Sequence, residues 1–441
     1  MNYMVVMNPE WGGVIPGIDL AKAIKRRGDT VVFAGPPSTD LIQRVWGIDW
    51  VRAVGFIESK DFDYVPCLTE LFASGFLEEF LDSKEPLYSI LVRALRQTAR
   101  ASIDELTGVL MERKIDILLL DSFLPFLAVA ARQVGIPCVY LRTNLRVAFN
   151  SSYPPSWSRV RPTGSWPSRL RVRLEWTRYW VLYTLFTTFG KHGGSIRKLA
   201  HDMKQWGEPF GLRVTLSDFG PEYEMPEVVL CPKSFDYPYM RGRNHVGLFD
   251  SDRLQEQYPL PFYPEGSKLL YVSLGTATSY FLKYANRFWQ LFFRVMEQNP
   301  TWYAIVQADE KTLPMQPLPP NAKVEPWVSQ IGALGVAQAA LVAGGLGTIK
   351  ECVVREVPFL IFPARHADKP GNAARVEFHG IGHEVDLASV DERSLTQSIE
   401  DLLRNRKKFV ANMQDIRREL LDDGSADAMF SFLENLVDQS K

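Results

Sequence analysis

Cysteine is scarce in this chain. Its 441 residues include only four cysteines, at positions 67, 138, 231 and 352. They lie far apart and form neither a CxxC pair nor a cluster with histidine. Zinc motifs need closely spaced ligands of this kind, so the pattern argues against a zinc site. Isolated thiols are typical of proteins in a reducing compartment.

Long apolar runs and an excess of one charge are also lacking. No run of roughly 18 apolar residues occurs, which argues against a membrane-spanning helix. The chain starts with a strand-like run rather than a basic segment followed by an apolar one, so we expect no signal peptide and a cytoplasmic location. The net charge of −1 gives no general attraction to nucleic acid or acidic membranes, and no nucleic-acid partner is expected.

The N-terminal part alternates short apolar runs with helical patterns. Continuous apolar runs are typical of strands that are buried on both faces of a parallel sheet. Strands that alternate with helices predict an α/β domain with a doubly wound sheet. The predicted strands span residues 3–7, 30–34, 117–120 and 138–141, and the predicted helices span 17–27 and 124–133.

This pattern stops at a segment over about residues 150–211, which looks helical and is rich in Trp, Tyr and Arg. A second series of strands and helices begins near residue 268, so we expect a second domain of the same class. The predicted domains are residues 1–245 and 246–424, and residues 425–441 form a final helix that can pack back on the first domain. The second series of strands spans residues 268–275, 302–307, 323–328, 339–342 and 357–362.

The most informative segment runs from Ala339 to Glu377. An apolar run meets a glycine cluster at residues 344–347, and a helical stretch with Thr348 and Glu351 follows. A second apolar run then leads through a polar loop into another helix. Such a unit places backbone N–H groups, a hydroxyl and a carboxylate around one anionic, hydroxyl-rich ligand. A nucleotide that carries a sugar is the candidate.

Four short motifs follow one another in this half of the chain. They are Tyr271–Thr276 (YVSLGT), Trp327–Gln330 (WVSQ), Ala343–Glu351 (AGGLGTIKE) and Ala367–Ala373 (ADKPGNA). In this order they resemble the motifs of inverting nucleotide-sugar glycosyltransferases of the bacterial macrolide and plant secondary-product type. The resemblance covers nearly the whole chain. It implies the α/β GT-B fold, in which two Rossmann-like domains with doubly wound parallel sheets face each other across a cleft.

The resemblance implies a donor site in the second domain. Trp327 would stack on the nucleobase, the backbone of Val328 would bind its edge, and Glu351 would bind the ribose hydroxyls. Each residue type also has an ordinary structural role, such as core packing for the tryptophan and turn formation for the glycines. The ordered set of motifs favours donor binding over these separate roles.

The remaining donor residues would bind the diphosphate and the sugar. Threonine hydroxyls and glycine N–H groups would hold the diphosphate at a helix N-terminus, while Asp368 and Lys369 would bind the sugar. No paired acidic motif lies beside the glycine cluster, so we expect no metal and no cofactor, only UDP or dTDP as part of the co-substrate. The implied donor set is Thr276, Trp327, Val328, Gln330, Gly345, Gly347, Thr348, Glu351, His366, Asp368, Lys369 and Asn372.

The chain departs from the family at two histidines. The family's general base lies just after the first strand, but here that loop contains Gly12 and Gly13, and Gly13 takes the place of the histidine. A positioned base contributes about 10²–10⁴-fold to a rate. Ala343 replaces a second histidine, which contacts the diphosphate in the family. His366 on the donor loop is a candidate substitute for that contact.

Two carboxylates are candidates for the missing base. Asp121, at the end of the strand over residues 117–120, matches the aspartate that orients the base in the family, although a helix N-cap is an equal alternative. Glu10 follows the first strand and should share the same crevice. A solvated loop charge is the favoured alternative for Glu10.

The aromatic and basic segment over residues 156–192 indicates where the acceptor binds. It predicts an apolar acceptor pocket, with a face that lies on a membrane or docks a protein partner. The alternative is an amphipathic helix that packs on its own domain and has a solvated basic side.

The predicted function is inverting, metal-independent transfer of a sugar from a UDP- or dTDP-sugar to a lipophilic natural product. Because Gly13 occupies the base position, the nucleophile can be an acidic O, N or C group. Two alternatives remain. One is a glycosyltransferase-like protein without sugar transfer, which acts as an auxiliary partner or binding module. The other is an enzyme that uses the fold for another reaction.

Overall fold

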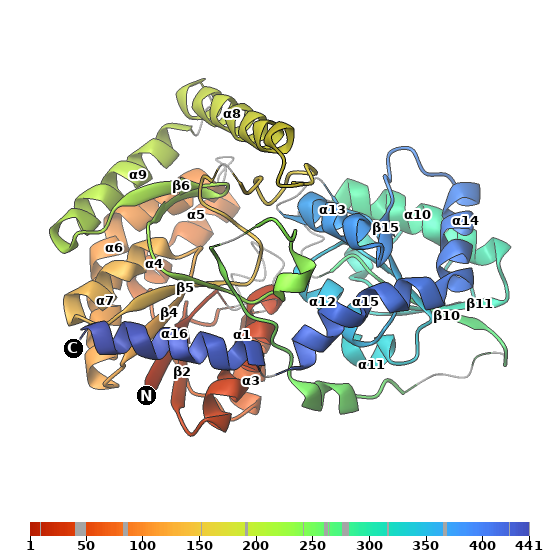
Figure 1. The fold of residues 1–441 in the computed structure, drawn as a ribbon, viewed down its shortest axis with the longest axis horizontal. Coiled ribbons are helices and arrows are strands. Elements are labelled where there is room, and N and C mark those ends of the chain that lie inside the picture. The colour runs from red at the N-terminus through yellow and green to blue at the C-terminus, as the bar shows by residue number, and fades with distance from the viewer. Residues whose placement is uncertain are drawn as a thin grey trace.

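The structure is a computed structural model. It describes residues 1–8, 10–39, 50–82, 87–150, 152–189, 193–240, 242–259, 263, 265–275, 282–314, 317–364, 368–422 and 424–440. Within these residues the chain forms two parallel sheets and one small antiparallel sheet. Figure 1 shows the two sheets, with their helices, as two lobes side by side.

The first sheet has the strand order β3-β2-β1-β4-β5-β8-β9, and all of its neighbouring strands are parallel. The central strands β1, β4 and β5 are apolar runs that are buried almost throughout, as expected for strands covered on both faces. The strands are β1 (Asn2–Val6), β2 (Thr30–Gly35), β3 (Tyr64–Pro66), β4 (Ile117–Asp121), β5 (Cys138–Arg142), β8 (Glu227–Val229) and β9 (Asn244–His245).

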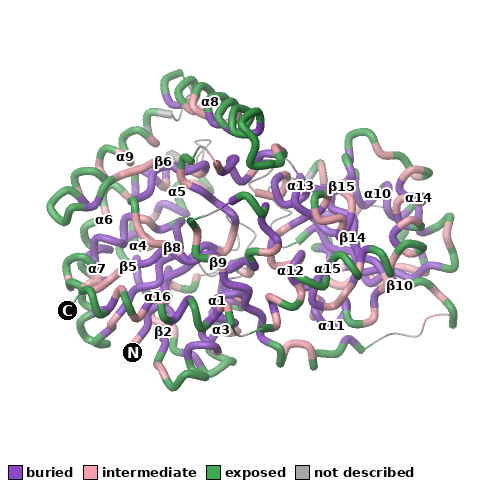
Figure 2. The backbone as a smooth tube through the Cα atoms, in the orientation of Figure 1, coloured by how far each residue is buried: buried purple, intermediate pink, exposed green. Residues whose placement is uncertain are grey.

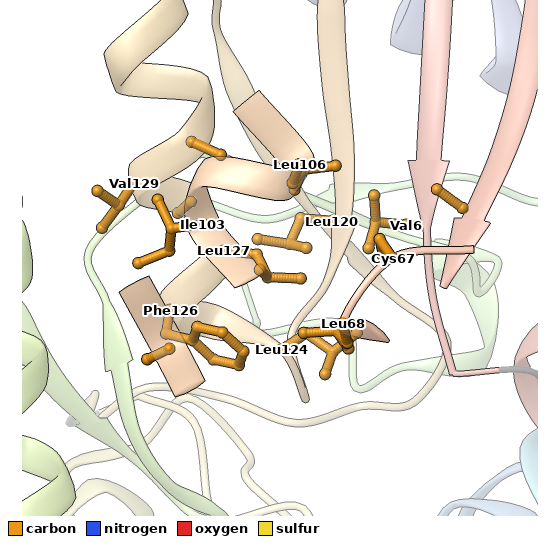
Figure 3. Packing of buried hydrophobic residues seen from close by; sticks show 14 of the residues in the cluster. Val6, Cys67, Leu68, Ile103, Leu106, Leu120, Leu124, Phe126, Leu127 and Val129 are labelled. Carbon is orange, nitrogen blue, oxygen red and sulfur yellow. The ribbon is translucent and has the colours of Figure 1, made fainter. Parts of the chain in front are cut away.

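Helices cover both faces of this sheet. Alternate residues of a strand point to opposite faces, so Val6 and Leu120 pack against one helical layer while Val5 and Leu119 pack against the other. Figure 3 shows part of the first layer, where Leu120 lies beside Leu127. The helices are α1 (Trp11–Arg26), α3 (Trp50–Ser59), α4 (Thr69–Ala73), α5 (Phe76–Asp82), α6 (Leu87–Glu112), η1 (Pro125–Leu127) and α7 (Ala128–Val134).

The second sheet repeats the same arrangement, with the order β12-β11-β10-β13-β14-β15 and parallel neighbours throughout. Its strands are β10 (Lys268–Ser273), β11 (Trp302–Gln307), β12 (Ala322–Glu325), β13 (Ala339–Val342), β14 (Phe359–Ile361) and β15 (Gly382–Glu384). Its helices are α10 (Leu282–Gln298), α11 (Gln330–Leu334), α12 (Leu346–Val354), α13 (Lys369–His379), α14 (Glu392–Arg404) and α15 (Arg406–Leu421). The predicted pair of doubly wound parallel domains is therefore confirmed.

The aromatic and basic segment contains two helices, α8 (Trp166–Phe189) and α9 (Gly193–Gly207). The antiparallel pair β6 (Val214–Ser217) and β7 (Gly220–Tyr223) follows them. Figure 1 shows α8 and α9 along the outer edge of the first lobe.

The last helix, α16 (Gly424–Ser440), returns to the first domain. Its residues Met429, Phe430 and Leu433 belong to the same buried cluster as Tyr3 and Val5 of β1. In Figure 1 the helix lies across the N-terminal elements, and the two chain ends are close to each other.

Candidate active site

Asp121 and Glu10 lie at the carboxyl ends of two neighbouring strands. Asp121 is the last residue of β4, which pairs with β1 so that Leu120 lies opposite Val6. Glu10 immediately precedes α1. The Asp121 carboxylate accepts a hydrogen bond of 3.0 Å from the N–H of Phe123, which is the capping-type contact expected of an aspartate in this position. This contact does not exclude a chemical role, because a carboxylate has further acceptor sites.

Both carboxyl groups hold protons more tightly than usual. Burial raises the pKa of Asp121 to about 6, although the N–H of Phe123 and the charge of Arg146 partly oppose the shift. Burial also raises the pKa of Glu10 to about 7, and the nearby charge of Asp121 adds to the effect. The Glu10 residue is nevertheless exposed to solvent, so the protein atoms around it raise its pKa without cutting it off from water. Groups with such pKa values exchange protons near neutral pH.

The structure has the start of a helix where the sequence predicts a loop, at residues 10–16. Helix α1 begins at Trp11, so Gly12 and Gly13 lie in its first turn and Pro16 lies inside the helix. Packing of Val14 and Ile18 against the first sheet outweighs the poor helix propensity of glycine and proline. A Cβ placed on Gly13 would meet only the carbonyl oxygen of Asn8, at 3.5 Å, so no close contact demands glycine there.

The aromatic rings of Phe123 and Phe219 lie beside Asp121, and the sequence did not predict this arrangement. Phe123 is 46% exposed, and its ring meets that of Phe219 edge-on with 5.8 Å between centroids. The guanidinium of Arg146 lies 5.5 Å from the Phe123 ring and donates a hydrogen bond of 3.1 Å to the carbonyl of Ser122. An accessible apolar surface therefore adjoins the candidate base.

The glycine turn after β13 has one position that requires glycine. Gly344 has φ of +87°, and a Cβ there would approach Cγ2 of Ile361 to 2.8 Å. Gly345 caps α12 without any side-chain hydrogen bond. A Cβ at Gly345 or Gly347 would meet nothing within 4 Å. The first turn of α12 therefore faces open space, which suits an anion.

Three predicted donor residues meet beside this turn. The amide nitrogen of Gln330 donates to the carboxylate of Glu351 and to the hydroxyl of Thr348, the latter at 3.3 Å. The hydroxyl of Tyr271 donates to the amide oxygen of Gln330 at 3.0 Å, which fixes the orientation of that amide. Glu351 itself is 6% exposed. The side chains thus form one hydrogen-bonded group although they come from two helices and a strand.

Arg253 belongs to the same group and was missed by the sequence analysis. It lies in the short helix η4 (Ser251–Gln255), within the connection between the domains. Its guanidinium forms an ion pair with Glu351 and lies 3.7 Å from the carboxylate of Asp19 on α1. Burial raises the pKa of Asp19 to about 6. Arg253 therefore links the candidate ribose-binding carboxylate to the first domain.

Trp327 follows β12 and lies at the boundary between the domains. Its ring centroid is 4.5 Å from that of Trp11 at the start of α1, and the guanidinium of Arg52 lies 4.0 Å from the same ring. The side chain of the neighbouring residue, Val328, is buried in the core of the second domain. Only the backbone of Val328 therefore remains for a ligand contact.

Asp368 and Asn372 form the other side of the candidate donor site. Asn372 donates hydrogen bonds to the carboxylate of Asp368 at 3.0 Å and to the carbonyl of Gly344 at 3.1 Å. The amide oxygen of Asn372 is buried without a hydrogen-bond partner. Burial raises the pKa of Asp368 and lowers that of Lys369 to about 8. The remaining two predicted donor residues, Thr276 and His366, lie outside the described residues.

Among the described residues, no group of three or more His, Cys, Asp and Glu side chains could hold a metal ion.

Comparison with known proteins gives a consistent result. A family model described as UDP-glucoronosyl and UDP-glucosyl transferase matches residues 296–420, within the second domain. The 4'-demethylrebeccamycin synthase of Lentzea aerocolonigenes is 23% identical over 352 residues, which is 77% of this chain and 78% of that protein. Zeaxanthin glucosyltransferase of Pantoea ananas is 28% identical over 117 residues, which is 26% of each chain.

Solved structures resemble the whole chain. The glycotransferase of kitacinnamycin has a TM-score of 0.69 at 19% identity and covers 99% of both chains. The glycosyltransferase VinC, in complex with dTDP, has a TM-score of 0.61 at 16% identity and covers 100% of both. These likenesses confirm the predicted GT-B fold. The family match and the named relatives identify the chain as a glycosyltransferase.

Proposed function

We propose that this enzyme transfers a sugar from a UDP- or dTDP-sugar to a lipophilic small molecule, without a metal ion or cofactor. The convergence of Gln330, Thr348 and Glu351 beside the open first turn of α12 carries the proposal. A carboxylate suits ribose hydroxyls, and an uncapped helix N-terminus suits a diphosphate. The donor classes agree with a family description that names UDP and with a solved relative that holds dTDP.

The acceptor site is proposed at the exposed ring of Phe123 beside Asp121. Apolar walls with a few polar groups are typical of sites for small organic molecules. The name of one relative, zeaxanthin glucosyltransferase, agrees with a natural-product acceptor.

The reaction is a single displacement, so the configuration at the anomeric carbon inverts. The nucleophile of the acceptor forms a bond to C1 as the bond from C1 to the diphosphate oxygen breaks, and the nucleoside diphosphate leaves with the electron pair. The proton of the acceptor passes to Asp121 or Glu10, whose raised pKa values suit a base near neutral pH. The first turn of α12 stabilises the charge that develops on the leaving diphosphate.

The competing function, a glycosyltransferase-like partner without sugar transfer, is not favoured, because the matched relatives are named as enzymes. The cytoplasmic location stays a prediction.

The test is a product assay. The purified protein is incubated with UDP- and dTDP-sugars and a panel of phenolic, polyketide and terpenoid acceptors, with a chelator present, and products are detected by mass spectrometry. We expect a glycoside whose anomeric configuration, measured by NMR, is opposite to that of the donor. One of the variants Asp121→Asn and Glu10→Gln, the one that removes the base, should lower the rate by about 10²–10⁴-fold. Asp104→Asn on the exposed side of α6 should not. A glycoside with retained configuration, or activity abolished by the chelator, would contradict the proposal.

A further inference from the structure

Helix α8 has apolar side chains on two opposite faces. The inner face packs onto the first domain, where Val172 and Trp176 belong to a small buried cluster with Tyr153 and Tyr237. The indole N–H of Trp176 donates a hydrogen bond of 2.6 Å to the carbonyl of Tyr153. This face fixes the helix to the domain, so the opposite face is turned away from the protein.

The outer face carries a stripe of exposed apolar side chains. Their spacing of four or seven residues places them on one side of the helix. Trp166 is 77% exposed and Phe189 is 81% exposed, at the two ends of the stripe. Figure 2 shows α8 at the rim of the molecule with much of its surface exposed. The stripe consists of Trp166, Leu170, Leu174, Val181, Leu185 and Phe189.

Arginines flank this stripe. Arg171, Arg173 and Arg178 are all exposed, and within the described parts of the chain none of their side chains forms an ion pair. The one acid of the helix, Glu175, is half-buried and accepts a hydrogen bond of 3.3 Å from Ser158. The outer side of α8 is therefore both apolar and strongly basic, although the net charge of the chain is −1.

We propose that the outer face of α8 docks on the surface of an anionic lipid bilayer. A large exposed apolar stripe is unusual on a protein that meets only water. A helix with an apolar face and basic flanks lies in the plane of a membrane interface, with its apolar side chains among the acyl chains. The arginine stems extend from the stripe so that each guanidinium reaches lipid phosphates.

The shape of the surface favours a bilayer over a protein partner. The stripe follows a helix of 24 residues, about 36 Å long, along a convex edge of the molecule. A bilayer fits such a ridge along its whole length, whereas a protein would need a groove of that length with an acidic rim. Helix α8 rests on the surface in this arrangement: none of the described helices is long and apolar enough to cross a membrane.

Sedimentation with lipid vesicles tests the inference, without nucleotide or acceptor, so the outcome is independent of sugar transfer. The wild-type protein should sediment with vesicles of phosphatidylcholine and phosphatidylglycerol at low salt. It should bind at least about tenfold less to phosphatidylcholine alone. The double variant Arg173→Glu/Arg178→Glu should lose about tenfold or more in affinity for the anionic vesicles. Leu174→Ser/Leu185→Ser should weaken binding even at low salt, because it removes apolar contact.

The matched control is Lys407→Glu/Lys408→Glu, which reverses two exposed charges on α15 in the other domain. This control should bind like the wild type, and thermal unfolding should show that all variants remain folded. A wild-type protein that stays in the supernatant with anionic vesicles would overturn the inference. The inference would also be overturned if the α8 variants and the control variant weakened vesicle binding to the same extent.

Discussion

The rings of Trp11 and Trp327 lie with 4.5 Å between their centroids, although the two residues belong to different domains. Arg52 adds a cation–π contact to the same Trp327 ring at 4.0 Å. Side chains of the first domain thus cover part of the ring that the family resemblance implies as the platform for a nucleobase. A nucleobase that stacks on Trp327 must share or displace these contacts.

This arrangement predicts opposite effects for the two tryptophans. Trp327→Ala should weaken UDP or dTDP binding by about 10-fold or more, because stacking of a base on an aromatic ring contributes about 1–3 kcal/mol. Trp11→Ala should leave binding unchanged or tighten it, because it uncovers the platform. Titration calorimetry measures both variants. Equal weakening by the two substitutions would show instead that Trp11 itself contacts the nucleotide.

The raised pKa of Asp121 predicts the pH dependence of activity. A carboxylate acts as a base only when it is deprotonated, so kcat/KM should fall as the pH drops through about 6 if Asp121 is the base. If Glu10 is the base, the fall should be centred near pH 7. The profiles of Asp121→Asn and Glu10→Gln assign the group. A wild-type profile that is flat from pH 5 to pH 8 would exclude both groups as the base.

The same pKa has a consequence for stability. The value of about 6 in the folded protein exceeds the ordinary value of 3.8, so folding favours the protonated carboxyl group. The contribution of the protonated Asp121 carboxyl group to the free energy of unfolding is fully present below pH 4 and is lost as the pH rises through 6. The unfolding free energy of the wild type minus that of Asp121→Asn should therefore fall by about 2 kcal/mol between pH 4 and pH 8. Urea denaturation across this range checks the sign, and a difference that moves toward the wild type would contradict it.

Restoring the missing histidine is a direct test of the base position. A Cβ at Gly13 makes only an ordinary contact, so the backbone there accepts a side chain. Thermal unfolding of Gly13→His shows whether the imidazole is also accommodated. If its imidazole reaches the acceptor and Asp121 orients it, kcat should rise, and the pH profile should gain a group near 6.5. Gly12→His, one residue earlier on the same helix turn and equally unobstructed, is the control. Identical kinetics of the two variants would mean that position 13 does not face the reacting groups.

The glycine turn predicts a contrast between adjacent residues. Gly344→Ala should destabilise the protein by about 1–2 kcal/mol or more, because it combines a left-handed backbone with a close approach to Ile361. Gly345 has φ of −65° and open space around it, so Gly345→Ala should lose only the advantage of glycine over alanine as an N-cap, about 1 kcal/mol or less. Thermal unfolding of the pair provides the comparison. If both variants had the same stability, Gly344 could not have the left-handed conformation and close approach to Ile361 on which the prediction rests.

The sequence was sufficient for the fold because its strands are short apolar runs between helices. The runs at 117–120 and 339–342 correspond to β4 and β13, each within one residue. The family resemblance implied Gln330, Thr348 and Glu351 as donor residues, and the structure brings these three side chains together. Parallel strands bring the segments that follow them to the same edge of the sheet.

Other features depend on contacts that no local pattern encodes. The family resemblance predicts a loop at residues 10–16, where α1 begins, although Trp11, Val14 and Ile18 have the spacing of one helix face. No sequence pattern marked Arg253 as a site residue. It reaches Glu351 only because the connection between the domains folds against α12. The predicted strand over residues 323–328 ends at Glu325, which leaves Trp327 in the loop beyond it.

Nucleotide binding tests the central claim most directly. Calorimetric titration with UDP and dTDP should show binding to the wild-type protein, and Glu351→Ala should abolish it, because Glu351 is the group proposed to hold the ribose. Glu297→Ala, an exposed glutamate on α10 of the same domain, should bind like the wild type. Binding of neither nucleotide by the folded wild-type protein would contradict the proposed donor site. So would nucleotide binding by a folded Glu351→Ala variant with undiminished affinity.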